Sequence, residues 1–124
     1  LALTPDNQYV LNNFAYYLSI RSEKLEQAKK MSLLSLELSP DNPTYLDTYA
    51  WILYKNKEYK EAYKYQEKAI KLSEKPSAAL FDHLGDMLFK LDRVDEAVLN
   101  WEKAKKSGDD SEELESKIRN KKIQ

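Results

Sequence analysis

The sequence predicts an all-α protein built as a series of antiparallel helix hairpins. Three small residues, Ala15, Ala50 and Gly85, recur 35 residues apart. Two further sets recur 34 and 35 apart: Ala28, Ala62 and Ala97, followed by Ser35, Ala69 and Ala104. Because the linked series share one period, each repeat contains two packed segments.

The small residues lie inside a constant frame of large apolar residues. The frames are Leu11, Phe14, Ala15 and Leu18; Leu46, Tyr49, Ala50 and Leu53; and Phe81, Leu84, Gly85 and Leu88. Spacings of three, one and three place these side chains on one face of a helix, since a turn takes 3.6 residues. A small residue at the centre of such a face lets a neighbouring helix approach closely.

Helix start and stop signals divide the chain into repeats. We expect a tail of a preceding repeat, three hairpin repeats and a C-terminal capping helix, over residues 1–7, 8–42, 43–77, 78–110 and 111–124. The first segment reads like the end of a preceding second helix, which predicts that this stretch belongs to a longer array. A lid at the C-terminal end is expected because a terminal hairpin otherwise leaves an apolar face in water.

Each boundary has its own signal. Asn42 followed by Pro43 predicts an N-cap and a first-turn proline. The other predicted N-caps are Ser22, Ser77, Asp92 and Ser111, and Gly108 is the expected stop of the helix that carries Trp101.

The pattern resembles the tetratricopeptide repeat (TPR) family, in which a large apolar residue, Leu, a small residue and an aromatic precede Ala, an aromatic and Pro. The third repeat fits best, with Phe81, Leu84, Gly85, Leu88, Ala97, Trp101 and Ala104 in register, and Pro40 closes the first. Ser32, Gln66 and Glu74 depart from the pattern. The resemblance implies a right-handed superhelix, a TPR-like α-solenoid.

Composition argues against several classes of function. Twenty basic and 21 acidic residues give a net charge of −1, whereas a nucleic-acid binder is usually strongly basic. With no cysteine and one histidine, neither a thiolate metal site nor a cysteine nucleophile can be built. We therefore expect no catalytic residues, no metal, no cofactor and no membrane insertion by this stretch.

In such arrays the first helices of successive repeats line a concave groove. Helical projection places twelve residues there: Tyr9, Asn12, Asn13, Tyr16, Asp47, Thr48, Trp51, Tyr54, Asp82, His83, Asp86 and Phe89. Aromatic anchors combined with amide donors suit a peptide. Trp51 and Tyr54 fit the core as well as the groove, His83 fits an ordinary surface position, and a solvated face explains Asp82 and Asp86 as well as binding does.

The sequence thus predicts a scaffold module that binds a protein or peptide in this groove. One alternative is a structural or self-associating segment that completes the superhelix of a longer protein, and another is the substrate-presenting arm of an enzyme. Family members that grip chaperone tails use Lys, Asn and Arg. At the matching positions this sequence has no Lys or Arg, but Asn12 and Tyr16, followed by Thr48, Ala79 and His83. Residues 11–16 and 45–51 are similar to stretches of bacterial repeat proteins, many of them exported, which implies a bacterial envelope or periplasmic protein.

Overall fold

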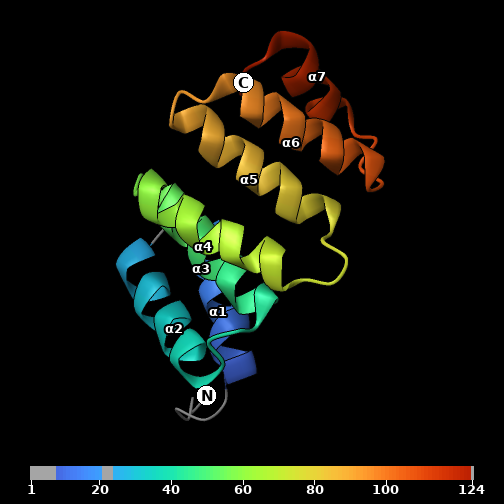
Figure 1. Cartoon of the computed structure of the whole chain (residues 1–124). Helices are drawn as coiled ribbons and strands as arrows, with labels where there is room; N and C mark the ends of the chain where they lie inside the picture. The colour runs from blue at the N-terminus through green and yellow to red at the C-terminus, as the bar shows by residue number, and fades with distance from the viewer. Residues whose placement is uncertain (1–7, 21–23, 124) are drawn as a thin grey trace. The chain divides into compact units, whose positions relative to one another are not determined.

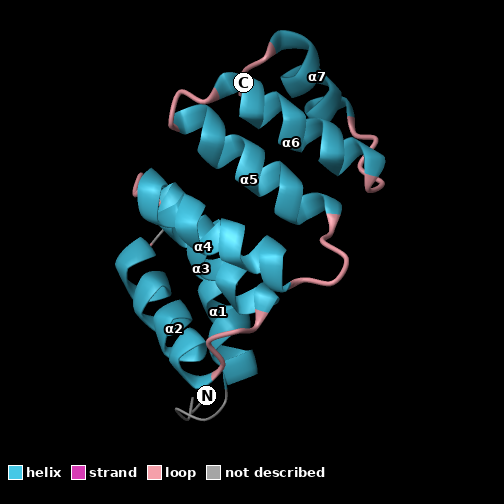
Figure 2. Cartoon of the chain, in the orientation of Figure 1, coloured by secondary structure: helices cyan, strands magenta, loops and turns pink. Residues whose placement is uncertain are grey.

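A computed structural model describes residues 8–20 and 24–123. Over these residues the chain forms seven helices and no strand (Figures 1 and 2). The helices are α1 (Gln8–Ile20), α2 (Leu25–Leu38), α3 (Pro43–Lys55), α4 (Tyr59–Leu72), α5 (Ala78–Lys90), α6 (Val94–Lys106) and α7 (Glu112–Asn120). The all-α fold and the pairing of helices into hairpins agree with the sequence.

The helices belong to two compact units, residues 1–72 and residues 73–124. In the first unit α1 packs on α2 and α3 on α4, and α3 also packs on α1 and α2. In the second unit α5 packs on α6, and α7 lies against α6. The expected tail over residues 1–7 and the expected cap Ser22 lie outside the described residues.

Side-chain caps begin three of the helices as expected. The Asn42 carboxamide oxygen accepts hydrogen bonds from the backbone N–H of Thr44 and Tyr45, at 2.9 and 3.2 Å. Ser77 and Ser111 cap α5 and α7 by accepting from the third residue beyond each. These bonds satisfy amides that a helix start leaves without intrahelical partners.

The prediction for Asp92 is wrong. The N-cap of α6 is Arg93, and it makes no side-chain capping bond. Asp92 instead has a left-handed backbone, with φ of 63°, and ends α5. The Arg93 N–H then donates to the Leu88 carbonyl at 2.9 Å, a bond that spans five residues and satisfies one of the last carbonyls of the helix.

The same ending recurs in other helices. Lys57, Gly108 and Lys121 also have positive φ, and the residue after each donates to the carbonyl five residues earlier. Gly108 is therefore the stop that the sequence predicted, but lysine fills two equivalent positions. A non-glycine residue in this region costs about 1 kcal/mol, which the surrounding hairpin must offset.

The small residues have the steric role that their spacing indicates. Ala15 and Ala50 are completely buried, as is every member of the series Ala28, Ala62 and Ala97. A Cβ built on Gly85 would lie 2.5 Å from Cδ1 of Trp101 and 3.1 Å from the Ala97 carbonyl oxygen. Only a residue without a side chain fits between α5 and α6 at this point.

Candidate functional site

The twelve residues predicted to bind a partner lie on the first helices of the three hairpins, α1, α3 and α5. Eight of them belong to the first unit and four to the second. The two sets have different surroundings.

In the first unit, the exposed members of the set are aromatic or amide residues. Tyr9 is 68% exposed and Tyr16 is 44% exposed, and Asn13 also faces solvent. The half-buried Trp51 and Tyr54 stack with ring centroids 4.7 Å apart and planes 12° from parallel. The sequence allowed either a core or a groove position for these two residues. In the structure they are neither enclosed in the core nor fully exposed.

A cation and a second tyrosine border the Trp51–Tyr54 stack. Lys55 Nζ lies 5.9 Å from the centroid of the Trp51 ring, within the range of a cation–π contact. The ring of Tyr59, at the start of α4, meets Tyr54 edge-on with centroids 5.5 Å apart. The stack is thus supported from both helices of its hairpin.

Asn12 and Thr48 do not belong to an accessible surface, which corrects the sequence prediction. Each is only 4% exposed. The Thr48 hydroxyl donates to the Thr44 carbonyl at 3.1 Å, one turn earlier in α3. The Asn12 Oδ1 atom is buried without a hydrogen-bond partner among the described residues.

Asp47 links the predicted surface to the second helix of its hairpin. Its carboxylate accepts a hydrogen bond at 2.9 Å from Nε2 of Gln66, a residue with no exposed surface. Asp47 itself is half-buried, so part of it still faces solvent.

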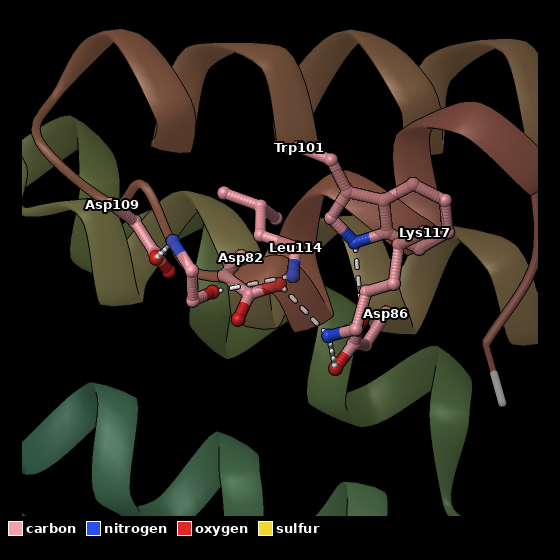
Figure 3. Close-up of polar contacts among 7 residues, drawn as sticks. Asp82, Asp86, Trp101, Asp109, Leu114 and Lys117 are labelled. Carbon is pink, nitrogen blue, oxygen red and sulfur yellow. Dashed lines mark hydrogen bonds and ion pairs between the residues drawn. The ribbon is translucent and has the colours of Figure 1, made fainter.

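In the second unit, two of the four predicted residues form part of a buried polar network (Figure 3). Lys117 Nζ, from α7, donates to Asp82 Oδ1 and to Asp86 Oδ1, both at 3.0 Å. Asp86 also accepts from the indole Nε1 of Trp101 at 3.0 Å. The side chains of Lys117 and Asp86 are only 7% and 8% exposed.

Burial and charge compete in this network. Burial raises the pKa of the Asp86 carboxyl, and the nearby Lys117 ammonium offsets this only in part. Burial also opposes the charge of Lys117, but Asp86 and Asp82 outweigh it, so the pKa of Lys117 is raised. The ammonium therefore stays protonated and neutralises an otherwise costly buried carboxylate.

The role of Asp86 also differs from the sequence prediction. Asp86 is neither a solvated residue nor open to a ligand, because Trp101 and Lys117 cover it. Asp82 is partly covered by the same lysine, and His83 and Phe89 are half-buried. The Phe89 ring lies 6.1 Å from that of Trp101, so it packs on the same network.

Lys117 is the important residue that the sequence analysis missed. It continues a series at the period of 35: Asn12, Asp47, Asp82 and Lys117. The period could therefore have shown that α7 begins in the register of another first helix. It could not have shown which lysine meets the buried aspartate.

The described residues contain no cluster of three or more histidine or acidic side chains that could hold a metal ion. Within the same part of the chain, every helix is too short or too polar to cross a bilayer. What the described surface offers is thus a set of aromatic, amide and acidic groups on the first helices.

Comparison with known proteins supports the repeat that the sequence and the helix hairpins indicate. The family described as anaphase-promoting complex, cyclosome, subunit 3 matches residues 21–104. The TPR repeat-containing protein PA4667 of Pseudomonas aeruginosa is 33% identical over 86 residues, which is 69% of this chain. That match spans only 14% of the length of the relative.

Solved structures show the same fold. The first TPR domain of Spaghetti (RPAP3), bound to the HSP90 peptide SRMEEVD, matches with a TM-score of 0.83 and 17% identity, covering 96% of this chain and 93% of that one. YrrB, described as a TPR protein with an unusual peptide-binding site, matches with a TM-score of 0.78 and 26% identity, covering 91% and 57%. The chain belongs to the tetratricopeptide repeat proteins, within the family described as anaphase-promoting complex, cyclosome, subunit 3.

Proposed function

We propose that this chain is a binding module that holds a peptide or an extended protein segment on the faces of its first helices. The observation that carries the proposal is the surface of the first unit formed by Asn13, Tyr16, Trp51 and Tyr54. These aromatic and amide groups remain exposed or half-exposed although the core of the unit is complete without them. Tyrosine and tryptophan provide large contact areas at a small cost in side-chain entropy, and asparagine can pair with an extended backbone.

Two structural relatives support the proposal by analogy. One was solved with a peptide bound, and the other is described by its peptide-binding site. Because a fold hosts many ligands, this analogy supports the class of ligand and not its sequence.

The buried residues narrow the proposed surface. Asn12, Thr48 and Asp86 are withdrawn from it because their side chains are enclosed. Tyr9 and Asp47 remain candidates as flanking contacts in the first unit, and Asp82, His83 and Phe89 remain candidates in the second unit by itself.

Panning a random-peptide phage library on the folded chain tests the proposal. We expect enriched peptides whose affinity falls by about tenfold or more in the Trp51→Ala, Asn13→Ala double variant. Leu99→Ala is the matched control, because Leu99 is 54% exposed on the second helix of another hairpin. Circular dichroism checks that both variants are folded. Peptides that bind the double variant and the parent equally well would contradict the proposed surface.

A second candidate function, completion of a longer array, is favoured by a different observation. An apolar face of α1 is exposed, although the same face is buried in α3 and α5.

A further inference from the structure

Helix α1 has an exposed apolar stripe made of Val10, Phe14 and Tyr17. The three residues are spaced by four and three, so they lie along one side of the helix. Phe14 is 40% exposed and Tyr17 is 52% exposed, and their rings stack with centroids 6.4 Å apart. Two stacked aromatic side chains that are each about half exposed form an apolar patch of the kind that marks an interface.

The repeat provides two internal controls for this stripe. Adding 35 and 70 to the three residue numbers gives Tyr45, Tyr49 and Ile52 in α3 and Leu80, Leu84 and Met87 in α5. All six counterparts are buried, and none is more than 8% exposed. Exposure of the stripe is therefore particular to α1 and not a property of first helices in this chain.

The first unit shows what covers such a stripe. Ile52, the counterpart of Tyr17, packs in one cluster with Ala15 and Leu18 of α1 and Ala28 of α2, and Met31 packs against it. The stripe of α3 is thus covered by the preceding hairpin through its small residues. Helix α3 packs on α2 as well as on α1.

We propose that the α1 stripe is the docking face for a further helical hairpin of the same repeat, located before α1 in the full-length polypeptide. The hairpin would present small residues equivalent to Ala15 and Ala28, flanked by an aliphatic residue equivalent to Leu18. The proposal goes beyond peptide binding, because Phe14 and Tyr17 are not among the residues proposed to hold a ligand. The relative PA4667 agrees with the proposal, because the match to this chain spans only 14% of the length of that TPR repeat-containing protein.

The surface chemistry of the second unit disfavours a head-to-tail second copy as the occupant. The exposed residues of α7 and its end are charged or polar, including Glu112, Glu113, Arg119 and Lys121. Placing these charges against Phe14 and Tyr17 would remove them from water without partners. A hairpin with small apolar contact residues has no such cost.

An extended chain tests the proposal. A copy of residues 8–42 is inserted directly before Gln8, which recreates the junction at which Asn42 precedes a first helix. We expect the melting temperature to rise by more than about 5 °C over that of the parent chain. No rise would overturn the proposal.

Charged substitutions show whether the stripe is responsible for the expected rise in melting temperature. Phe14→Lys with Tyr17→Lys, made only in the original α1, should abolish the rise in the extended chain and change the parent by far less. The matched control, Asn13→Lys with Tyr16→Lys on the adjacent exposed face of α1, should leave the rise in place. A rise that survives the stripe substitutions would contradict the proposal.

Sedimentation equilibrium of the parent chain separates a hairpin from a second copy. We expect no dimer that depends on the stripe. A dimer that Phe14→Lys with Tyr17→Lys abolishes would assign the stripe to self-association and overturn the proposal. These results are independent of the phage experiment, which reports on Trp51 and Asn13.

Discussion

The two units have different residues at the same pair of facing positions in the repeat. Gln66 in the first unit and Trp101 in the second are 35 residues apart and fully buried, as are Ala50 and Gly85 on the facing helices. The larger Trp101 faces glycine, while the smaller Gln66 is in the repeat that has alanine. A Cβ on Gly85 would collide with the indole. In these two repeats the larger of the two second-helix residues faces the smaller first-helix residue, so the size of one facing side chain limits the size of the other.

This difference in size brings a difference in polarity. The Trp101 N–H needs a buried acceptor, which is Asp86, and Asp86 in turn needs the ammonium of Lys117. In the first unit Gln66 donates to Asp47, which is half-buried and can keep part of its hydration. The core of the second unit therefore depends on α7, whereas that of the first unit requires no such cation.

Removing the buried cation should have the largest effect. We expect Lys117→Met to lower the free energy of unfolding by about 3–5 kcal/mol, because Asp86 would remain buried without a counter-charge. Urea denaturation measures this loss by the fluorescence of Trp101, in a Trp51→Phe background that leaves one tryptophan. Lys121→Met, at an exposed position just after α7, should change stability by less than about 0.5 kcal/mol. An equally small effect of Lys117→Met would show that the second unit does not depend on this ion pair.

The Gly–Trp pair should be the next most sensitive feature. Gly85→Ala should destabilise the chain by about 1–3 kcal/mol through overpacking, although alanine is the better helix former. In a Trp101→Gln background the same substitution should cost nothing or stabilise, since it recreates the pairing of the first unit. Urea denaturation followed by circular dichroism completes this double-mutant cycle. Equal losses of stability in the two backgrounds would show that glycine at position 85 is not required to make room for Trp101.

Acid should act with opposite signs at Glu58 in the first unit and at Asp86 in the second. In the first unit, hydrogen bonds from Asn56 and Lys29 hold the pKa of Glu58 below its ordinary value of 4.5. Stability from Glu58 is therefore complete above that value and is lost as the pH falls through the folded-state pKa. In the second unit the pKa of Asp86 is raised above 3.8, so the folded state takes up that proton more readily and acid adds stability.

Melting curves from neutral pH to about pH 3 test these signs. The stability difference between the parent and Glu58→Gln should be constant near neutral pH and shrink below pH 4.5. The difference between the parent and Asp86→Asn should move the other way, in favour of the parent. Parallel curves for the parent and Glu58→Gln would mean that the Lys29–Glu58 pair contributes nothing.

The smallest expected effect is that of an acidic peptide. The first helices of the two units carry Asp47 and Asp82, and the sequence has Thr48, Ala79 and His83, with no Lys or Arg, where the family resemblance would put a carboxylate clamp. We therefore expect the peptide SRMEEVD to bind more weakly than about 1 mM in calorimetry. Micromolar binding would contradict this expectation, and its loss in Lys55→Met would assign the counter-charge to the lysine beside Trp51.

Features that depend on local spacing could be predicted from the sequence. The small residues specify close helix contacts, and Asn42, Ser77 and Ser111 specify helix starts, because these effects act within one or two turns. Asp92 was misassigned because aspartate suits both an N-cap and a left-handed residue, and the hairpin turn decides between them.

Features that depend on long-range contacts could not be predicted. Asn12, Thr48 and Asp86 each lie beside a residue of the buried frame, at the edge of a helix face, and a neighbouring helix decides whether such an edge is covered. The partner of Asp86 comes from α7, 31 residues away. With many lysines in the chain, charge alone does not select Lys117.

The enclosure of Lys117 makes it a natural reporter of how firmly α7 is held. Nearly all of its side chain is shielded, while Lys121 and Lys122 in the same segment are exposed. An amine-selective acylating reagent can react with Lys117 only after α7 detaches, whereas it reacts with Lys121 and Lys122 at once. The lag between these labels, read by mass spectrometry, would time the detachment of a single short helix.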